Sequence, residues 1–331
     1  MYPDPNDPVE RWPPAVGEPG REVWYSLVSP ADGSVAFWYR YTLLSTAGGR
    51  REGRLWAALT DRAEPANSTF VSRAVPPAAV DAEGDPFELA VGDAVLTSSS
   101  ATGAVDDVAW DLEYRPDDYA FTPLRSETLT DLLSRVAGTG KHWSRNESVR
   151  MSGEVTVGDR TIELEAAPGH QGHTVSSMSP PKEWTWVQCN AFEEAEATLE
   201  ALRLDGKLSL CFRVDGEVYP LNRVRDVLPY SPAGNVVDRD DVGHWRFRGA
   251  GEGLELQATV EAPADHWQTV AYMTPDDSLR YNAHCSLSTV TVTYSVDGGP
   301  TRTITSDAAR AEWVAAEPPV EGDYEPTWDR A

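Results

Sequence analysis

The chain has 331 residues, a net charge of −25 at pH 7 and a mean hydropathy of −0.43. Its length predicts two domains, since a typical domain takes roughly 150 residues. The negative charge makes nucleic acid an unsuitable partner, because phosphates repel carboxylates. No apolar run approaches the roughly 18 residues that a membrane-spanning helix requires.

The start of the chain is rich in proline and acidic residues, whereas a signal peptide carries a basic end followed by an apolar segment. We therefore expect a cytoplasmic protein. Cys189, Cys211 and Cys285 cannot all pair within one molecule and show no metal-ligand spacing, so we expect buried free thiols. Dispersed carboxylates and scarce lysine favour a halophilic source, because a large net charge opposes association. A GC-rich genome would also favour arginine over lysine.

Alternating side chains dominate the chain and predict β-strands. In residues 37–43 both faces carry aromatic groups, as in a barrel wall, and Trp38 and Arg40 share one face. In residues 108–114 large apolar side chains, Trp110 among them, alternate with acids, which is typical of a half-buried strand. Further strands are expected at residues 54–61, 87–96, 154–166, 210–221, 244–249, 254–262 and 288–299.

Turn signals join several of these strands. Gly158-Asp159, Asp215-Gly216 and Asp297-Gly298 supply the positive φ angles of tight hairpins. Many short strands with tight turns favour barrels or sandwiches.

Two segments have helical character. Apolar residues repeat with a helical period from Leu129 to Val136, and Gly138 can end that helix, which we expect at residues 127–137. Residues 193–204 also favour a helix by composition, but they lie within a series of strands, where tertiary contacts can override this preference.

The predicted fold class is all-β, with two antiparallel β-barrels in tandem and a short connecting helix. We expect the N-terminal barrel at residues 1–147 and the C-terminal barrel, which ends in an acidic tail, at residues 148–331. The two would meet near residues 148–165.

The most informative segment, residues 181–192, is PKEWTWVQCNAF. As a strand it places Trp184, Trp186, Gln188 and Asn190 on one face, which combines two indoles with two neutral amides. Such a face suits an apolar ligand with one polar group. From the spacing alone, a core strand with aromatic packing is the simpler interpretation.

This segment resembles the tocopherol cyclase stretch in which a lysine precedes a W-x-W-V-Q-C-N-x-F run. Just upstream, residues 169–173 (GHQGH) resemble the QGH element of the double-lipocalin superfamily, which contains tocopherol cyclases and carotenoid hydratases. The usual continuation there, His-Asn-Trp-Gly, is His173-Thr174-Val175-Ser176 in this chain. Residues 37–44 with 54–61, and residues 282–285, are similar to other parts of the cyclase. The resemblance implies two lipocalin-like barrels around an apolar small molecule.

The resemblance and the shared strand face together indicate site residues. The candidate catalytic residues are His173, Gln188 and Asn190. The candidate ligand-binding residues are Trp38, Arg40, Trp110, Trp184, Trp186 and His284. We expect residues 184–190 to line the cavity of the C-terminal barrel, with His173 near its mouth. A structural role in the core is the alternative for the histidines, and pairing with an acidic neighbour is the alternative for Arg40.

Members of this superfamily add an oxygen nucleophile across an alkene. Protonating an unactivated alkene needs a strong acid in a dry pocket and electron-rich walls, which Trp184 and Trp186 can supply. Asp111, Glu193 and His173 are candidates for the acid. A related intramolecular cycloaddition needs only neutral donors and a shaped pocket.

The predicted function is a cyclase or hydratase that acts on an apolar prenylated or polyene molecule. A non-catalytic carrier of a lipid, pigment or isoprenoid is the alternative. We expect no cofactor and no metal, because His170 and His173 lack further ligands at a suitable spacing. The oligomeric state stays open.

Overall fold

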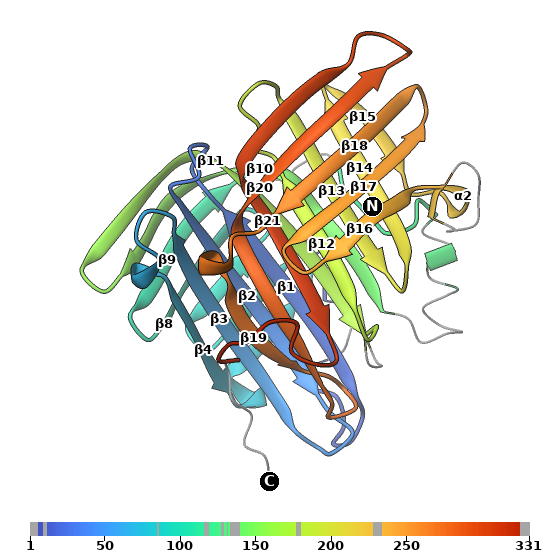
Figure 1. Cartoon of the computed structure of the whole chain (residues 1–331). Helices are drawn as coiled ribbons and strands as arrows, with labels where there is room; N and C mark the ends of the chain where they lie inside the picture. Colours follow the sequence, from blue (N-terminus) through green and yellow to red (C-terminus); the bar gives the residue numbers. More distant parts are fainter. Residues whose placement is uncertain are drawn as a thin grey trace.

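The computed structural model describes residues 6–8, 12–84, 86–115, 119–126, 129, 130, 132, 140–176, 180–227 and 234–324. Nearly all of the regular structure is antiparallel strand, arranged in two large sheets (Figure 1). The first sheet is coloured blue to green and the second yellow to red. The predicted all-β fold of two lipocalin-like units is confirmed.

The first sheet is built from residues 20–176. Its strands are β1 (Gly20–Val28), β2 (Val35–Ser45), β3 (Arg51–Asp61), β4 (Thr69–Val75), β5 (Val80–Glu83), β6 (Glu88–Val91), β7 (Ala94–Thr97), β8 (Ser100–Val105), β9 (Val108–Tyr114), β10 (Lys141–Val157) and β11 (Arg160–Ser176). They are ordered β4-β3-β2-β1-β11-β10-β9-β8-β7-β6-β5. A Cβ atom on Gly53 would overlap Val80, so β3 and β5, near opposite ends of this order, approach each other and nearly close a barrel.

The second sheet is built from residues 184–315. Its strands are β12 (Trp184–Cys189), β13 (Ala197–Leu204), β14 (Lys207–Val214), β15 (Glu217–Leu221), β16 (Val236–Asp241), β17 (His244–Gly251), β18 (Leu254–Glu261), β19 (Gln268–Met273), β20 (Leu279–Val296) and β21 (Arg302–Ala315). They are ordered β15-β14-β13-β12-β21-β20-β18-β17-β16, and β19 pairs with one end of β20.

Short helical turns complete the described structure. They are α2 (Val224–Val227) and the 3-10 turns η1 (Pro65–Asn67), η2 (Pro77–Ala79) and η3 (Ala264–His266). Most of the helix predicted at residues 127–137 lies outside the described residues.

The strands and turns predicted from the sequence are present, except that the single strand expected at residues 87–96 is two short strands, β6 and β7, joined by a turn at Gly92-Asp93. The segment 108–114 coincides with β9, and the three turn dipeptides join β10 to β11, β14 to β15 and β20 to β21. In residues 193–204 the helical preference does not prevail, because Ala197–Leu204 forms strand β13 between β12 and β14. Pairing with two neighbouring strands outweighs the weak intrinsic preference for helix.

The division between the sheets lies later in the chain than the expected one at residue 148. That residue is inside β10, which pairs with β9 and β11 of the first sheet, and β11 pairs with β1. The first sheet therefore continues to Ser176. We propose that the second unit begins between Ser176 and Trp184.

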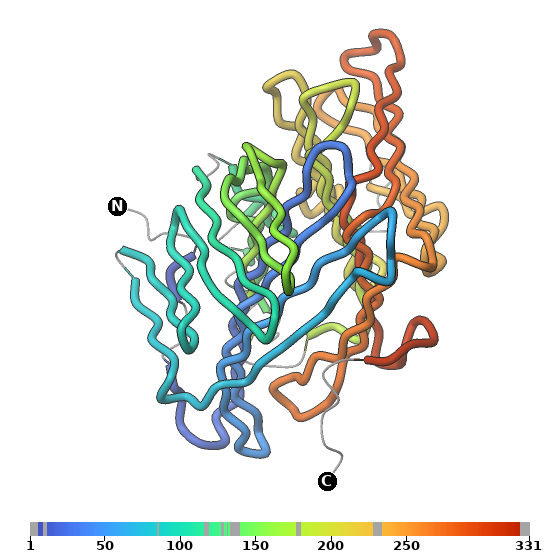
Figure 2. Tube along the Cα trace, turned by 90° about the vertical axis from the view of Figure 1, so that its left-hand side faces the viewer, coloured from blue at the N-terminus to red at the C-terminus, as the bar shows by residue number. Residues whose placement is uncertain are grey.

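Each sheet encloses its own apolar core, and a third cluster joins the two sheets. Phe37, Tyr39 and Tyr41 on β2 point into the first core, as the alternation predicts, whereas Trp38 lies in the joining cluster with Trp186 of β12. Figure 2 shows the two sheets side by side in the view turned by 90°. The outer face of the first barrel thus packs on the second sheet.

Candidate functional site

The side chains between the two sheets are mostly apolar but enclose several polar groups. The buried members of the joining cluster are Leu27, Trp38, Trp56, Ala58, Phe121, Trp186, Leu202, Cys211, Val270 and Tyr272. Tyr25, Phe70, Tyr119 and Trp184 pack against them and are partly exposed. We call this layer the inter-sheet site.

The face shared by Trp184 and Trp186 points to this site and not into the C-terminal barrel. The intervening Val187 and Cys189 fill the second core instead. The predicted strand face is therefore correct, and its expected location in the barrel cavity is wrong. Alternation along a strand separates two faces but does not show which of them is enclosed.

Gln188 and Asn190 lie on the same face but are bound to a buried arginine. Arg310 Nη1 donates to Gln188 Oε1 over 3.0 Å and to Asn190 Oδ1 over 2.8 Å, and Nη2 donates to Pro168 O over 3.0 Å. The Gln188 amide nitrogen donates to Glu147 O, and that of Asn190 donates to Gly169 O. Both amides thus join the second sheet to β10 and β11.

His173 and Trp110 lie away from the inter-sheet site. The His173 ring stacks between Trp24 and Trp143, with centroid distances of 4.7 and 5.0 Å, and its Nε2 is 2.8 Å from Glu22 Oε1. Trp110 belongs to the first core. The structure therefore separates these two candidates from Trp38, Arg40, Trp184, Trp186 and His284, which it brings together between the sheets.

A fully buried carboxylate, Glu200 on β13, forms the polar centre of the inter-sheet site. Its Oε1 accepts hydrogen bonds from Ser144 Oγ at 2.5 Å and from Trp186 Nε1 at 3.0 Å. Two histidines face it, with His170 Nε2 at 3.5 Å from Oε2 and His142 Nε2 at 3.7 Å from Oε1. Neither ring nitrogen of His170 makes a hydrogen bond to a described residue, and the Oε2 atom of Glu200 accepts none.

The surroundings of Glu200 and His170 favour an ionised carboxylate beside a neutral imidazole. Burial alone would raise the pKa of Glu200, but the nearby His142 and His170 outweigh burial and lower that pKa below its usual value. Burial lowers the pKa of His170, and the nearby Glu200 opposes this only in part. At neutral pH the pair therefore holds Glu200 ionised and His170 neutral, which is the state of a general base.

Tyr25 on β1 closes this centre. Its ring lies 5.7 Å from that of His170 and meets Trp186 edge-on at 6.1 Å. Burial, Glu200 and Glu312 raise the pKa of Tyr25 well above its usual value, so the hydroxyl stays protonated as a hydrogen-bond donor. Gly172 makes this position possible, because a Cβ atom there would overlap the Tyr25 ring. Gly172 of the QGH element thus leaves space for Tyr25, and His170, which directly precedes that element, lies at the site.

A second polar group lies on the other side of Tyr25. The Arg40 guanidinium lies 4.0 Å from the Tyr272 ring centroid, and its Nε donates to Thr42 Oγ1 over 2.9 Å. His284 Nδ1 is 3.1 Å from Glu312 Oε1, and its ring lies 5.8 Å from that of Trp38. Burial and Glu312 raise the pKa of Tyr272 to about 12.

Sequence reasoning did not identify Glu200, Tyr25 or His142 as site residues. Glu200 is hidden within the helix-like stretch 193–204, and nothing in its neighbours along the chain marks it as buried. Tyr25 and His142 come from strands far apart in the sequence. The GHQGH segment at residues 169–173 was the one available signal, since it contains His170.

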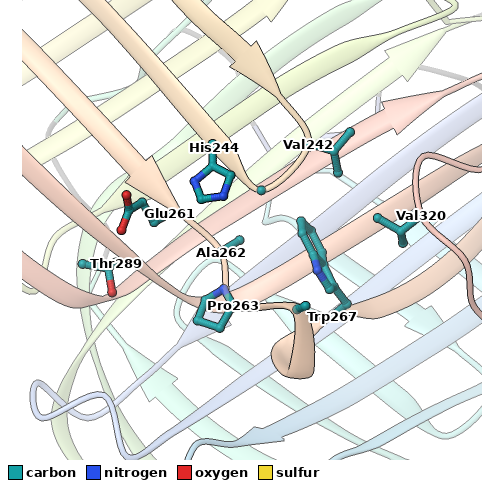
Figure 3. Close-up of a pocket in the computed structure, with 10 residues that line it drawn as sticks. Val242, His244, Glu261, Ala262, Pro263, Trp267, Thr289 and Val320 are labelled. Carbon is teal, nitrogen blue, oxygen red and sulfur yellow. The ribbon is translucent and has the colours of Figure 1, made fainter.

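A surface hollow lies elsewhere on the second sheet (Figure 3). Its volume is about 430 Å³, and its lining includes His244, Glu261 and Trp267. His244 and Glu261 are both solvent-exposed. The hollow therefore lacks the enclosed acid–base pair of the inter-sheet site. No group of three or more possible metal ligands occurs among the described residues.

Two antiparallel lipocalin-like sheets packed through an aromatic layer define a double-lipocalin fold. Solved structures of this kind match almost the whole chain. CghA aligns with a TM-score of 0.58 at 12% identity, covering 96% of this chain and 97% of its own. The AttH-type protein NE1406 from Nitrosomonas europaea aligns with a TM-score of 0.55 at 13% identity, covering 96% of this chain and 100% of its own.

Kievitone hydratase from Nectria haematococca aligns with a TM-score of 0.50 at 12% identity, covering 89% of this chain and 88% of its own. These proteins belong to the tocopherol cyclase and carotenoid hydratase-like double-lipocalin group, so the resemblance seen in the sequence is confirmed at the level of the fold. No family model matches the chain, and no curated protein does. No helix among the described residues is long and apolar enough to cross a membrane.

Proposed function

We propose that this chain is a cyclase or hydratase that binds a mostly apolar molecule between its two sheets. The observation that carries the proposal is the buried Glu200–His170 pair, which faces Tyr25 and Trp186 at the inter-sheet site. Functional sites concentrate such buried titratable groups. The names of two matching structures agree with this class, since one is a hydratase and CghA was solved with the small molecule Sch210972.

The charge state of the site favours one version of the chemistry. A carboxylate held ionised beside a neutral imidazole is a base, and protonation of an unactivated alkene would need a strong acid. We therefore favour addition of an O–H group, from water or from the substrate, to an alkene conjugated with a carbonyl.

In this reaction the Glu200–His170 pair takes the O–H proton as oxygen bonds to the β-carbon of the alkene. The alkene electrons move to the carbonyl oxygen, and the Tyr25 hydroxyl donates a hydrogen bond to the enolate that forms. The proton then passes from the pair to the α-carbon, which restores the carbonyl. The partly exposed aromatic rings of Tyr25, Trp184 and Tyr119 would orient the apolar part of the molecule.

Mass spectrometry of the molecules that co-purify with the protein tests this proposal. The extracted molecules are returned to wild type and to Glu200→Gln in water labelled with ¹⁸O and deuterium. A hydratase would give a product with one added ¹⁸O and one deuterium on carbon, and a cyclase would give an isomer with one deuterium. Glu200→Gln should bind the molecule without converting it.

Recovery of the bound molecule unchanged from wild type would contradict catalysis and support the carrier. Trp186→Leu, compared with Trp245→Leu in the second core, then tests the location of binding. If both variants fold and only the substitution of Trp245 weakens binding, the molecule lies in the second barrel and not between the sheets.

A further inference from the structure

The inter-sheet site contains more positive charge than its acidic neighbours balance. Arg21, Arg40 and Arg280 are all buried in this region, with exposed fractions of 9%, 7% and 6%. The protein as a whole carries a net charge of −25, so a buried group of arginines is unusual for this chain. Burying cations without paired anions is unfavourable, because the interior solvates charge poorly.

Tyr272 connects the three arginines. The Arg40 guanidinium lies 4.0 Å from the Tyr272 ring centroid, and Arg280 is the direct partner of Tyr272 in the pairing of β19 with β20, which places both side chains on one face. Burial and then the nearby positive charges of Arg40 and Arg280 lower the pKa of Arg21 to about 9, whereas Tyr272 opposes this. The three guanidinium groups therefore act on one another across a shared space.

None of these arginines forms an ion pair with a carboxylate of the described residues. Glu312 is in contact with His284, and Arg40 influences it only through space. Arg40 Nε donates to a hydroxyl, and Arg280 donates to the neutral oxygens of Pro180, Pro181, Ser278 and Leu279. Three cations against two carboxylates, Glu200 and Glu312, leave an excess of positive charge that the described residues of this site do not neutralise.

We propose that Arg21, Arg40 and Arg280 form a subsite for an anionic group, a carboxylate or a phosphate ester, at one end of the apolar molecule. Guanidinium groups bind both anions through charge-assisted hydrogen bonds. Tyr25 is paired with Arg40 across β1 and β2 and touches His170 on its other side. Tyr25 would therefore lie between the anion and Glu200. Binding of the anion in this position directs the rest of the molecule toward the acid–base pair.

This inference rests on the proposed function, because it names the class of molecule that the inter-sheet site accepts. Three matched amphiphiles test it: tetradecanol, tetradecanoic acid and tetradecyl phosphate, each displacing the neutral probe N-phenyl-1-naphthylamine at mildly alkaline pH. Wild type should bind at least one of the two anions about tenfold or more tighter than the alcohol. The preferred anion distinguishes a carboxylate ligand from a phosphate ester.

Charge-neutral variants locate the subsite. Arg40→Gln and Arg21→Gln should each reduce the affinity for the anion toward that for the alcohol and leave the alcohol unchanged, whereas Arg40→Lys should keep part of the preference. The control is Arg248→Gln, because Arg248 is 56% exposed on β17 and should not affect selectivity. If Arg40→Gln does not fold, the selectivity of wild type and that of Arg21→Gln are sufficient to test the anionic subsite.

Equal binding of alcohol and anions by wild type would overturn the anionic subsite. If Trp186→Leu still weakens that binding, the proposed function stands without it. If the preference for the anion persists in both Arg21→Gln and Arg40→Gln, the anion binds elsewhere and the subsite is also refuted. If none of the amphiphiles displaces the probe and Trp186→Leu has no effect on probe binding, the inter-sheet site does not bind apolar molecules and both proposals fail.

Discussion

Replacing Glu200 with glutamine removes one negative charge from the inter-sheet site and keeps the size of the side chain. The oxygen of glutamine can still accept the bonds that Ser144 and Trp186 donate to Glu200 Oε1. A hydrogen bond to a charged acceptor contributes about 1.5–3 kcal/mol and a neutral one about 1 kcal/mol. Loss of the charge should therefore lower the free energy of unfolding at pH 7 by about 2 kcal/mol, less the relief from burying a neutral group.

The dependence on pH gives the sharper expectation. Because the pKa of Glu200 is lowered in the folded protein, its contribution is present above the usual value of 4.5 and is lost as the pH falls through the folded value. The lowered pKa of His170 acts in the same direction: below about pH 6.5 the unfolded histidine binds a proton before the folded one does. Without Glu200 to raise it, the pKa of His170 should fall further.

The difference in melting temperature between wild type and Glu200→Gln should therefore widen as the pH falls from 7 toward 5. It should shrink again below about pH 4.5, because Glu200 of the unfolded wild type binds a proton there while the folded carboxylate is still ionised. Thermal unfolding followed by near-ultraviolet circular dichroism across this range measures it. Glu255→Gln, an exposed position on β18, is the matched control and should show no such profile.

A gap that stays constant with pH would refute the reasoning, because Glu200 would then not be ionised in the folded protein. If Glu200→Gln is as stable as wild type at pH 7, the cost of burying the carboxylate charge equals the stabilisation from its stronger hydrogen bonds.

Three further expectations concern the joint between the sheets and the surface. Arg310→Met should lower the free energy of unfolding in urea by about 3 kcal/mol or more, because it leaves the acceptors of Gln188, Asn190 and Pro168 buried without this donor. A loss under about 1 kcal/mol would show that the hydrogen bonds of Arg310 do not hold the two sheets together. Gly172→Ala should displace Tyr25 and weaken probe binding more than it lowers the melting temperature, and normal binding would exclude Tyr25 from the site. The melting temperature of wild type should rise steeply between low and molar salt, since screening shortens from about 10 Å at 0.1 M to about 3 Å at 1 M; a flat profile would contradict a halophilic origin.

The sequence alone determined many of the strands, three of their turns and the assignment of side chains to faces, but it did not show strands such as β1 and β19. In residues 37–43 the alternation separates Tyr39 and Tyr41 from Trp38 and Arg40, and the structure places these groups on opposite sides of β2. This information is local, because consecutive side chains of a strand point in opposite directions. The segment 181–192 and the QGH element were sufficient to predict the fold for the same reason, since both are short and contiguous.

Only the tertiary structure decided which face of each strand lies inside a barrel and which lies between the sheets. Trp186 and Val187 both lie in hydrophobic clusters, and it is the packing of the first barrel on β12 that places Trp186 at the inter-sheet site. The acid–base pair has the same origin, because Glu200 and His170 belong to different sheets and meet at 3.5 Å only when these pack together. Contacts between residues so far apart in the chain leave no periodic or spacing signal, because they depend on how whole sheets pack.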